Sequence, residues 1–583
     1  MTTTTSDSPA PASLQKPRDV QLLAIAPDTL ALRSRSWNRL RFEIEYALER
    51  GTTANSYLIR GDKRALIDPP GGSFTERFLD TLQQQADFSQ LDYVILGHVN
   101  INRLETLQAL LEQAPQVTLV CSNPAAITLR EAFDRPLNIQ VMKGAPDEQL
   151  DLGQGHQLRF IPVPTPRWPD GLWTYDTYSQ VLYTDKFFGA HICDERVYDL
   201  GWEALLEDRR YYFDCLMAPS VRQVATALEK LEDLPKVHLI APGHGPLVLY
   251  GLHELVQLYQ QRSQQQQTQT LSVTLIYASA YGNTATIAQA IARGITKAGV
   301  SVESINAEVA ETEDIRAAIE RGAGFLIGSP TLGGHAPTQI QTALGTILST
   351  APKTQLTGVF GSFGWSGEAI DLLENKLKDA GYSFGFEPIR VKFKPTDVTL
   401  KFCEEAGTDF AQALKKAKRP KTTRTPASAV EQAVGRLVGS LSIVTARQGE
   451  VASAMLASWV AQATFTPPGF TVAVAKERAI EALMYPGSAF VLNILAEGQH
   501  LGPMKHFLKP FAPGEDRFAG VETETAENGC PFLKEAIAYL ECEVSSRMEC
   551  GDHWVVYATV TRGEVLQPNA KTAIHHRKSG SHY

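Results

Sequence analysis

Three glycine-containing loops in the middle of the chain have the residue types that bind a phosphate and a flat ring. The first loop places hydroxyl groups, a glycine and free backbone N–H groups before a predicted helix. Backbone amides and the helix dipole at a helix N-terminus favour a bound phosphate. The residues predicted to contact the ligand here are Ser279, Tyr281, Gly282, Asn283 and Thr284.

The second and third loops are glycine-rich, so the backbone can approach a planar ligand, and Tyr281 or Trp365 could stack on that ligand. No lysine follows as in an NTP-hydrolysing P-loop, and no G-x-G-x-x-G follows the first strand, which disfavours both of those motifs. The second loop contributes Pro330, Thr331, Leu332, Gly333 and Gly334, and the third contributes Ser362, Phe363, Gly364, Trp365 and Gly367.

Alternating strands and helices must position these loops. Residues 271–278 form an apolar, β-branched run, and Ile287, Ile291 and Ile295 then recur at helical spacing. Further strands are predicted over 300–307, 325–328 and 356–361 and within 384–393, with a helix near 313–321. This alternation predicts a doubly wound parallel sheet, with ligands beyond the carboxyl ends of its strands. The segment resembles flavodoxins, and the resemblance implies bound FMN.

Polar side chains also follow several predicted strands nearer the N-terminus. His98 follows the strand over 91–96, Asp185 ends the strand over 181–185, and His244 follows the strand over 237–240. This layout resembles the metallo-β-lactamase superfamily, which implies an αββα fold. Joined to a flavodoxin-like segment, it resembles the flavodiiron proteins. That resemblance implies seven ligands for two irons, in a His-x-Glu-x-Asp-His run followed by a His, an Asp and a His.

The chain departs from that ligand pattern at four of the seven positions. Asn100, Asn102 and Arg103 stand where the family has Glu, Asp and His, and Arg167 stands at the next His position. Only His98, Asp185 and His244 match. Guanidinium keeps its proton and cannot ligate a metal. A unit charge about 4 Å away is worth on the order of 4 kcal/mol at an effective dielectric near 20, so two arginines would oppose a dication.

We therefore expect no diiron centre in this pocket. Arg103 or Arg167 is expected to pair with Asp185 or to hold a small anion. His98 and His244 are then simply hydrogen-bonded loop histidines. A mononuclear zinc hydrolase is a poorer interpretation, because its His-x-His-x-Asp-His run is absent as well.

Short strands with turn signals near the C-terminus predict a barrel. The segment resembles the flavin reductase family, which implies a split β-barrel that binds FMN or FAD and takes hydride from NAD(P)H. Ser453, Ser458, Trp459, Gln462 and Thr464 are expected in a loop that lines the flavin, with Asn493 and His553 as further candidates. Each of these residues could equally have an ordinary packing role.

Composition limits the remaining possibilities. A hydrophobic content of 43% over 583 residues allows sizeable cores, and the net charge of -9 disfavours nucleic-acid binding. Seven scattered cysteines without a C-x-x-C pair suit a reducing compartment, so we expect a cytoplasmic protein. No run of about 18 or more apolar residues occurs, so we expect no membrane insertion. The N-terminus resembles a frayed tail more than a targeting peptide. Polar segments at 260–270 and 415–428 are interpreted as linkers that bound domains 20–260, 271–414 and 429–583.

The domain order resembles the flavodiiron proteins of oxygenic phototrophs, among them the members that lack several iron ligands. It implies an oxidoreductase that passes electrons from NAD(P)H through flavins towards reduction of O₂ to water. The diiron site would come from a ligand-complete partner in an oligomer. The alternative is a regulatory or scaffolding subunit without redox turnover. Neither the partner nor the choice between NADH and NADPH can be identified from the sequence.

Overall fold

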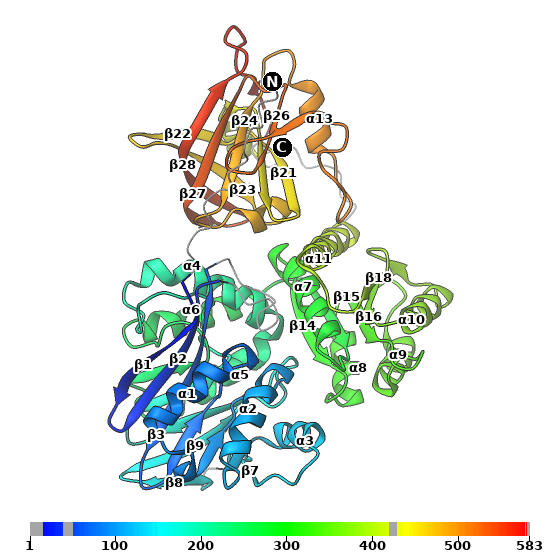
Figure 1. Ribbon diagram of the computed structural model, residues 1–583. Coiled ribbons are helices and arrows are strands. Elements are labelled where there is room, and N and C mark those ends of the chain that lie inside the picture. The colour runs from blue at the N-terminus through cyan, green and yellow to red at the C-terminus, as the bar shows by residue number, and fades with distance from the viewer. Residues whose placement is uncertain (1–15, 39–49, 146, 419–427, 578, 580–583) are drawn as a thin grey trace, which may run out of the picture. The chain divides into compact units, whose positions relative to one another are not determined.

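The computed structural model describes residues 16–38, 50–145, 147–418, 428–577 and 579. The chain divides into two compact units, Met1–Thr268 and Gln269–Tyr583, and each is described by itself (Figure 1). Within the described ranges, no helix combines the length and apolar character needed to cross a bilayer. The N-terminal tail and most of the second proposed linker lie outside the described residues.

The first unit contains two mixed sheets. The first sheet follows chain order: β1 (Asp19–Ala26), β2 (Thr29–Ser36), β3 (Thr52–Arg60), β4 (Arg64–Ile67), β5 (Tyr93–Ile95), β6 (Thr118–Cys121) and β7 (Ile139–Val141). The second sheet has the order β12 (Leu239–Pro242), β11 (Val181–Asp185), β10 (Leu172–Asp176), β9 (His156–Pro162) and β8 (Gln149–Gly153). One face of each sheet contributes to a shared apolar core, which includes Ile67 and Tyr183.

Helices cover the other side of the first sheet and complete the unit. Phe78 of α1 and Leu110 of α2 pack with Leu58 and Leu66 in a second core, so the expected αββα fold is confirmed. The helices are α1 (Thr75–Gln85), α2 (Ile101–Gln113), α3 (Asn123–Ala132), α4 (Trp202–Tyr212), α5 (Val221–Glu232) and α6 (Leu252–Gln267).

The interpretation of residues 260–270 as a linker is wrong over most of its length. Helix α6 continues to Gln267, anchored in its first half by the buried Leu255, Leu258 and Tyr259. Glutamine and arginine are good helix formers, so the polar half extends a helix that is already nucleated. The boundary between the two compact units lies directly after this helix, at Thr268.

The flavodoxin-like part of the second unit is the predicted doubly wound parallel sheet. Its order is β14 (Ser301–Asn306), β13 (Ser272–Tyr277), β15 (Gly324–Pro330), β16 (Leu356–Phe363) and β17 (Ser383–Phe384), with β18 (Ile389–Lys392) also beside β16. Its helices are α7 (Asn283–Lys297), α8 (Thr312–Arg321), α9 (Thr338–Thr350), α10 (Glu368–Asp379) and α11 (Asp397–Lys418). Ile287, Ile291 and Ile295 are fully buried, as their spacing predicts.

The C-terminal part is an antiparallel barrel-like sheet around its own apolar core. The strand order is β21 (Val451–Ala457), β20 (Ser442–Gln448), β24 (Ala489–Ile494), β27 (Ala538–Cys550), β28 (His553–Val565), β23 (Pro468–Ala475) and β22 (Val460–Phe465). The smaller elements are α12 (Ala429–Val434), β19 (Gly439–Ser440), α13 (Leu501–Leu508), β25 (Thr523–Thr525), β26 (Pro531–Leu533) and β29 (Ile574–His575).

The expected flavin-lining loop over 453–464 is instead two strands, with a turn at Ser458 and Trp459. Strand β21 pairs with β20, and β22 pairs with β23. Alternation explains the difference, because Met455 and Ala457 face the barrel core together with Val472 of β23.

Candidate functional site

Arg103 lies at the centre of the pocket in the first unit. It is in the first turn of α2, where Asn100 caps the helix by accepting a hydrogen bond from the Arg103 amide (2.9 Å). The guanidinium donates through Nη1 to Asp68 Oδ1 (2.9 Å) and through Nη2 to Asp185 Oδ1 (2.5 Å). The sequence predicts that Arg103 or Arg167 either pairs with Asp185 or holds a small anion. In the structure, Arg103 pairs with Asp185.

The two carboxylates that bind Arg103 follow strands of the two different sheets of the first unit. Asp68 follows β4 and Asp185 ends β11, and both are buried. Burial raises the pKa of Asp68 to about 6, against the attraction of Arg103. Burial also opposes ionisation of Asp185, but Arg103 and then Lys186 outweigh it and hold the pKa of its carboxyl below the usual value. The pocket therefore uses its own carboxylates to neutralise an internal cation.

Lys186 brings a second cation into the pocket. Its Nζ lies 3.5 Å from Asp185 Oδ1 and 3.3 Å from His244 Nε2. His244 is also held through Nδ1 by the carbonyl oxygen of Thr53 (2.8 Å). Burial, followed by the charge of Lys186, lowers the pKa of His244 to about 3. His244 is therefore neutral at physiological pH and faces an ammonium group.

His98 is held by a carboxylate. Its Nδ1 lies 2.7 Å from Asp170 Oδ1, and the other oxygen of Asp170 accepts from the Val99 amide (2.8 Å). Arg167 places its guanidinium carbon 5.8 Å from the centre of the Trp168 ring. Asn102 is half-buried in the first turn of α2. Asp68, Asp170 and Lys186 were not predicted, although Lys186 directly follows the predicted strand over 181–185.

These residues do not fit a diiron centre. Where the described part of the chain is concerned, no group of three or more His, Cys, Asp or Glu side chains is placed to hold a metal ion. Asp185 already binds Arg103 and Lys186, so this carboxylate is not available to a metal ion without losing those ion pairs. Two buried cations would repel a dication at this position. The geometry thus matches a pocket closed by internal ion pairs.

In the second unit, the three predicted loops meet at the carboxyl edge of the parallel sheet. Thr284 and Ser362 bring their hydroxyl oxygens within 2.8 Å, and the Thr331 amide donates to the Ser362 carbonyl (2.9 Å). Ser279 Oγ accepts from the Ala285 amide (3.0 Å) at the start of α7. Gly282 precedes that helix in the left-handed region (φ 80°), which favours glycine. The arrangement leaves a helix N-terminus facing a shared loop cluster.

The apolar groups of these loops are exposed to an unusual degree. Tyr281 is 73% exposed and Trp365 is 92% exposed, and Leu332 is exposed as well. Open space surrounds Gly333 and Gly334, both at positive φ, while the buried Thr331 Oγ1 has no hydrogen-bond partner. A flat aromatic ligand with hydrogen-bonding edges would cover these side chains and satisfy that hydroxyl, so the residues fit FMN.

The other predicted residues lie on the same loops. Pro330 ends β15, Phe363 ends β16, Asn283 begins α7, and Gly367 precedes α10. Phe393 was not predicted. It follows β18, is 56% exposed and lies 3.6 Å from the Cβ position that Gly364 lacks. Its only sequence signal is an aromatic residue at the end of the fifth predicted strand.

In the barrel, the structure brings Trp459 and His553 together but not all of the other candidates. Their ring centres are 5.1 Å apart. Ser453 and Ser458 are buried, and neither hydroxyl has a hydrogen-bond partner. The orphaned Ser458 hydroxyl directly precedes Trp459 of this aromatic pair, so a bound flavin there could satisfy it. Arg577, which was not predicted, places its guanidinium carbon 4.8 Å over the Trp459 ring.

Asn493, Gln462 and Thr464 make contacts that need no ligand. Asn493 Nδ2 donates to the Ile443 carbonyl (3.0 Å), and its Oδ1 accepts from the Leu533 amide (2.8 Å). Thr464 donates to the Pro467 carbonyl (2.7 Å), and Gln462 donates to the Thr464 carbonyl (3.4 Å), both within the exposed β22–β23 hairpin. These contacts stabilise the barrel and one of its hairpins.

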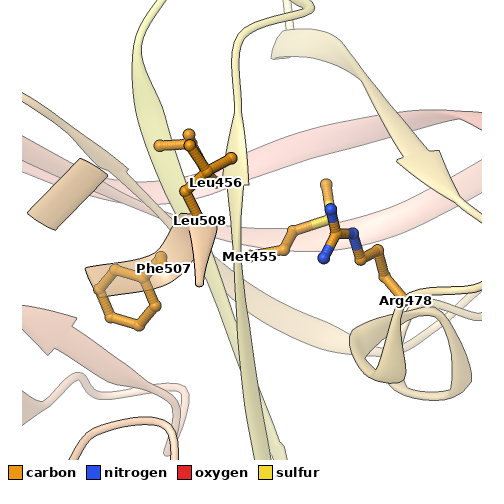
Figure 2. A pocket seen from close by; sticks show the side chains of 5 residues that line it. All are labelled: Met455, Leu456, Arg478, Phe507 and Leu508. Carbon is orange, nitrogen blue, oxygen red and sulfur yellow. The ribbon is translucent and has the colours of Figure 1, made fainter. Parts of the chain in front are cut away.

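A separate pocket lies elsewhere on the barrel. Figure 2 shows its lining, which is apolar apart from one guanidinium. The lining residues are Met455, Leu456, Arg478, Phe507 and Leu508. None of them is a predicted flavin contact, so this pocket is not part of the Trp459 cluster.

Comparison with known proteins assigns a family to each domain. Residues 52–245 match the ODP family beta lactamase model, residues 275–407 match flavodoxin, and residues 434–581 match the flavin reductase like domain. These matches support flavin binding by the second and third domains and flavin-mediated electron transfer as the common activity.

Two relatives align with this chain over nearly their whole length. Diflavin flavoprotein A 6 of Nostoc sp. (strain PCC 7120) is 66% identical over 98% of this chain and 100% of its own length. Diflavin flavoprotein A 3 of Synechocystis sp. (strain PCC 6803) is 65% identical over 97% of this chain and 96% of its own.

A solved structure also covers the first two domains. A metal-soaked Flv1 flavodiiron core from Synechocystis sp. PCC6803 is 64% identical, with a TM-score of 0.67, over 69% of this chain and 100% of its own. The chain therefore belongs to the diflavin flavoproteins, the cyanobacterial flavodiiron proteins with a flavin reductase domain, and is an oxidoreductase.

Proposed function

We propose that this protein takes electrons from NAD(P)H at its barrel and passes them through flavins towards reduction of O₂ to water. The reducing site is supplied by a ligand-complete flavodiiron partner in an oligomer. The observation that carries the proposal is the contrast between two sites of one chain. The flavodoxin-like loops keep an open, aromatic-lined surface, whereas Arg103 and Lys186 fill the pocket where the family holds metal.

The flavodoxin-like residues support FMN binding with distinct tasks. The α7 N-terminus, with Ser279 and Thr284, would hold the phosphate, and Tyr281 and Trp365 would cover the ring system. Thr331 Oγ1 would hydrogen-bond to a polar edge of the ring. Bound FMN would supply a centre that accepts and releases electrons.

The pocket of the first unit supports transfer to a partner. A guanidinium bound to two carboxylates cannot be displaced by a metal without leaving buried charges unpaired. We therefore expect purified protein to carry flavin but no stoichiometric iron. Elemental analysis that finds about two irons per chain would contradict this part of the proposal.

Reduction of the bound flavin tests whether the protein accepts electrons from NADH or NADPH. Purified protein is mixed anaerobically with NADH or NADPH, and the flavin absorbance band is followed. Bleaching of the band by at least one nicotinamide is the expected result. If neither nicotinamide bleaches it, electron transfer fails as an explanation, and the regulatory or scaffolding subunit becomes the better one.

Oxygen uptake tests whether this protein passes electrons to a ligand-complete partner. The protein is combined with a ligand-complete relative, and NAD(P)H-dependent O₂ consumption is compared with the sum of the two proteins measured alone. A rate above that sum is expected. A mixture that only reaches the sum would argue against transfer to the partner.

A further inference from the structure

Arg577 lies near the C-terminus of the chain, yet it is fixed against the barrel. Strand β29 pairs with β19, so that His575 lies opposite Gly439, and the Leu441 amide donates to the Ala573 carbonyl (2.8 Å). Gly439 in turn passes close to the Trp459 turn, because a Cβ there would lie 2.0 Å from the Ser458 carbonyl oxygen. The pairing of β29 with β19 and the close approach of Gly439 to Ser458 therefore place Arg577 beside the Trp459 ring.

Arg577 is buried, and no acidic side chain among the described residues pairs with its guanidinium. The side chain is only 8% exposed, its Nη1 has no hydrogen-bond partner, and the ion pairs of the described residues include none to Arg577. Stacking on an indole is favourable for a guanidinium but does not neutralise it. A buried charge is costly unless it is paired, so the site is arranged for an anionic ligand.

Other basic groups gather around the same tail segment. Burial lowers the pKa of His575, and the charges of Arg577, His576 and His500 lower it further. Ser458 precedes Trp459 directly and is 5% exposed, with a buried hydroxyl that has no partner among the described residues, and the His553 ring lies 5.1 Å from the indole. The cluster thus combines aromatic surface, a hydroxyl and positive charge.

We propose that Arg577 binds a phosphate group of the nucleotide that occupies the Trp459 site. This inference rests on the proposed function, because it deepens the nucleotide-binding role of the barrel. A guanidinium makes two parallel, charge-assisted hydrogen bonds to a phosphate, which a lysine cannot reproduce. The phosphate belongs either to the flavin or to the nicotinamide nucleotide, and the two sources share this chemistry.

The test begins with equilibrium binding, which needs no turnover. In the full-length chain, Y281A and W365A first weaken the flavodoxin-like site, and binding of FMN and of riboflavin is then titrated. The added variant is R577Q. The matched control is R562Q, which removes an exposed arginine of β28 that pairs with Glu527.

The two phosphate sources predict different patterns. If Arg577 binds the flavin phosphate, R577Q raises the Kd for FMN by roughly tenfold or more but leaves riboflavin unchanged. If it binds the 2′-phosphate of NADPH, FMN binding is unchanged, and the KM for NADPH rises while that for NADH does not. If it binds the pyrophosphate, both nicotinamides lose affinity. R577K should restore only part of any loss.

One outcome would overturn the inference. If R577Q shifts only the thermal midpoint and leaves all of these constants at the R562Q values, Arg577 merely packs on Trp459. Failure of the proposed function would look different, since neither nicotinamide would then reduce wild-type protein. In that case the FMN and riboflavin titrations still decide whether Arg577 binds the flavin phosphate, and equilibrium titration with NADPH and NADH decides whether it binds a nicotinamide phosphate.

Discussion

Arg103 places a permanent positive charge between two buried carboxylates in the pocket of the first unit. It bridges Asp68 and Asp185, which follow different sheets of the first unit, and so holds together the strand ends that form the pocket. A guanidinium has no empty orbital and no redox state, so it cannot polarise or reduce O₂. What remains is a structural function: an ion pair that neutralises two buried carboxylates.

Replacing Arg103 by methionine should therefore destabilise the first unit. Removing one partner of a buried ion pair costs about 3–5 kcal/mol, because the remaining charges are left unpaired. In R103M the pKa values of Asp68 and Asp185 rise above their unfolded values. Stability is then recovered as pH falls, because protonation is favoured in the folded state. Urea midpoints at pH 7 and pH 5 should show a smaller loss at pH 5.

The control for R103M is a second substitution that removes one of the two unpaired carboxylates. R103M/D68N should be more stable than R103M at pH 7, and its pH dependence should be weaker. If R103M is as stable as the wild type at pH 7, the ion pairs do not hold the pocket together.

A substitution of Trp365 should affect FMN affinity but not the stability of the protein. Trp365 is 92% exposed, so Trp365→Ala should change the stability of flavin-free protein by no more than about 0.5 kcal/mol. FMN affinity should fall by about tenfold, since a ring contact of about 1.5 kcal/mol is lost. Fluorescence titration with FMN measures this. V430A, at an exposed valine in α12, should leave FMN affinity unchanged.

At the scale of elements, α7 has two roles. Its N-terminus follows Gly282 at the proposed phosphate site, and its backbone packs closely against α11. A Cβ on Gly294 would lie 1.9 Å from the Glu404 carbonyl oxygen of α11, and one on Gly407 would lie 2.1 Å from the Ile291 carbonyl oxygen. The two glycines therefore let the helix backbones approach each other. The orientation of α7, and with it the N-terminus at Gly282, depends on this packing.

Substituting Gly294 by alanine should force α7 and α11 apart. Overpacking costs typically about 1–3 kcal/mol, and FMN affinity should fall because the α7 N-terminus moves. Gly345 offers the matched control, since it lies within α9 with nothing near its missing Cβ. G345A should stabilise the protein by up to about 1 kcal/mol through helix propensity. Equal effects of G294A and G345A on the unfolding midpoint would contradict the packing argument.

For the whole molecule, the proposed electron path, from the flavodoxin-like site of this chain to the metal site of a partner, predicts which variants stop oxygen uptake. If electrons leave this chain through its flavodoxin-like site, Y281A/W365A should remove the gain seen on mixing with a ligand-complete relative. The G345A variant should keep that gain, because Gly345 lies within α9 and away from the three loops. NAD(P)H-dependent O₂ consumption by the mixture is the measurement. A full gain with Y281A/W365A would mean that electrons reach the partner by another route.

Much of this organisation can be predicted from local sequence. The alternation of apolar runs with helical spacing predicts the parallel sheet, because periodicity reports which face of an element is buried. Strands at 272–277 and 356–363 lie where the pattern indicates them, and Ile287, Ile291 and Ile295 are buried. The four substituted ligand positions are also visible directly, since residue type alone decides that Arg103 cannot ligate a metal.

Contacts between distant segments were decided only by the tertiary structure. Asp68, Lys186 and His244 meet through strand pairing and sheet packing, and no local period connects them. The same holds for Arg577, which reaches Trp459 because β29 pairs with β19. The sequence by itself determined which chemistry each residue can perform and which elements form. Long-range packing decided which residues face one another. Burying an unpaired charge is costly, so the folded state is one in which buried charges from distant segments form pairs.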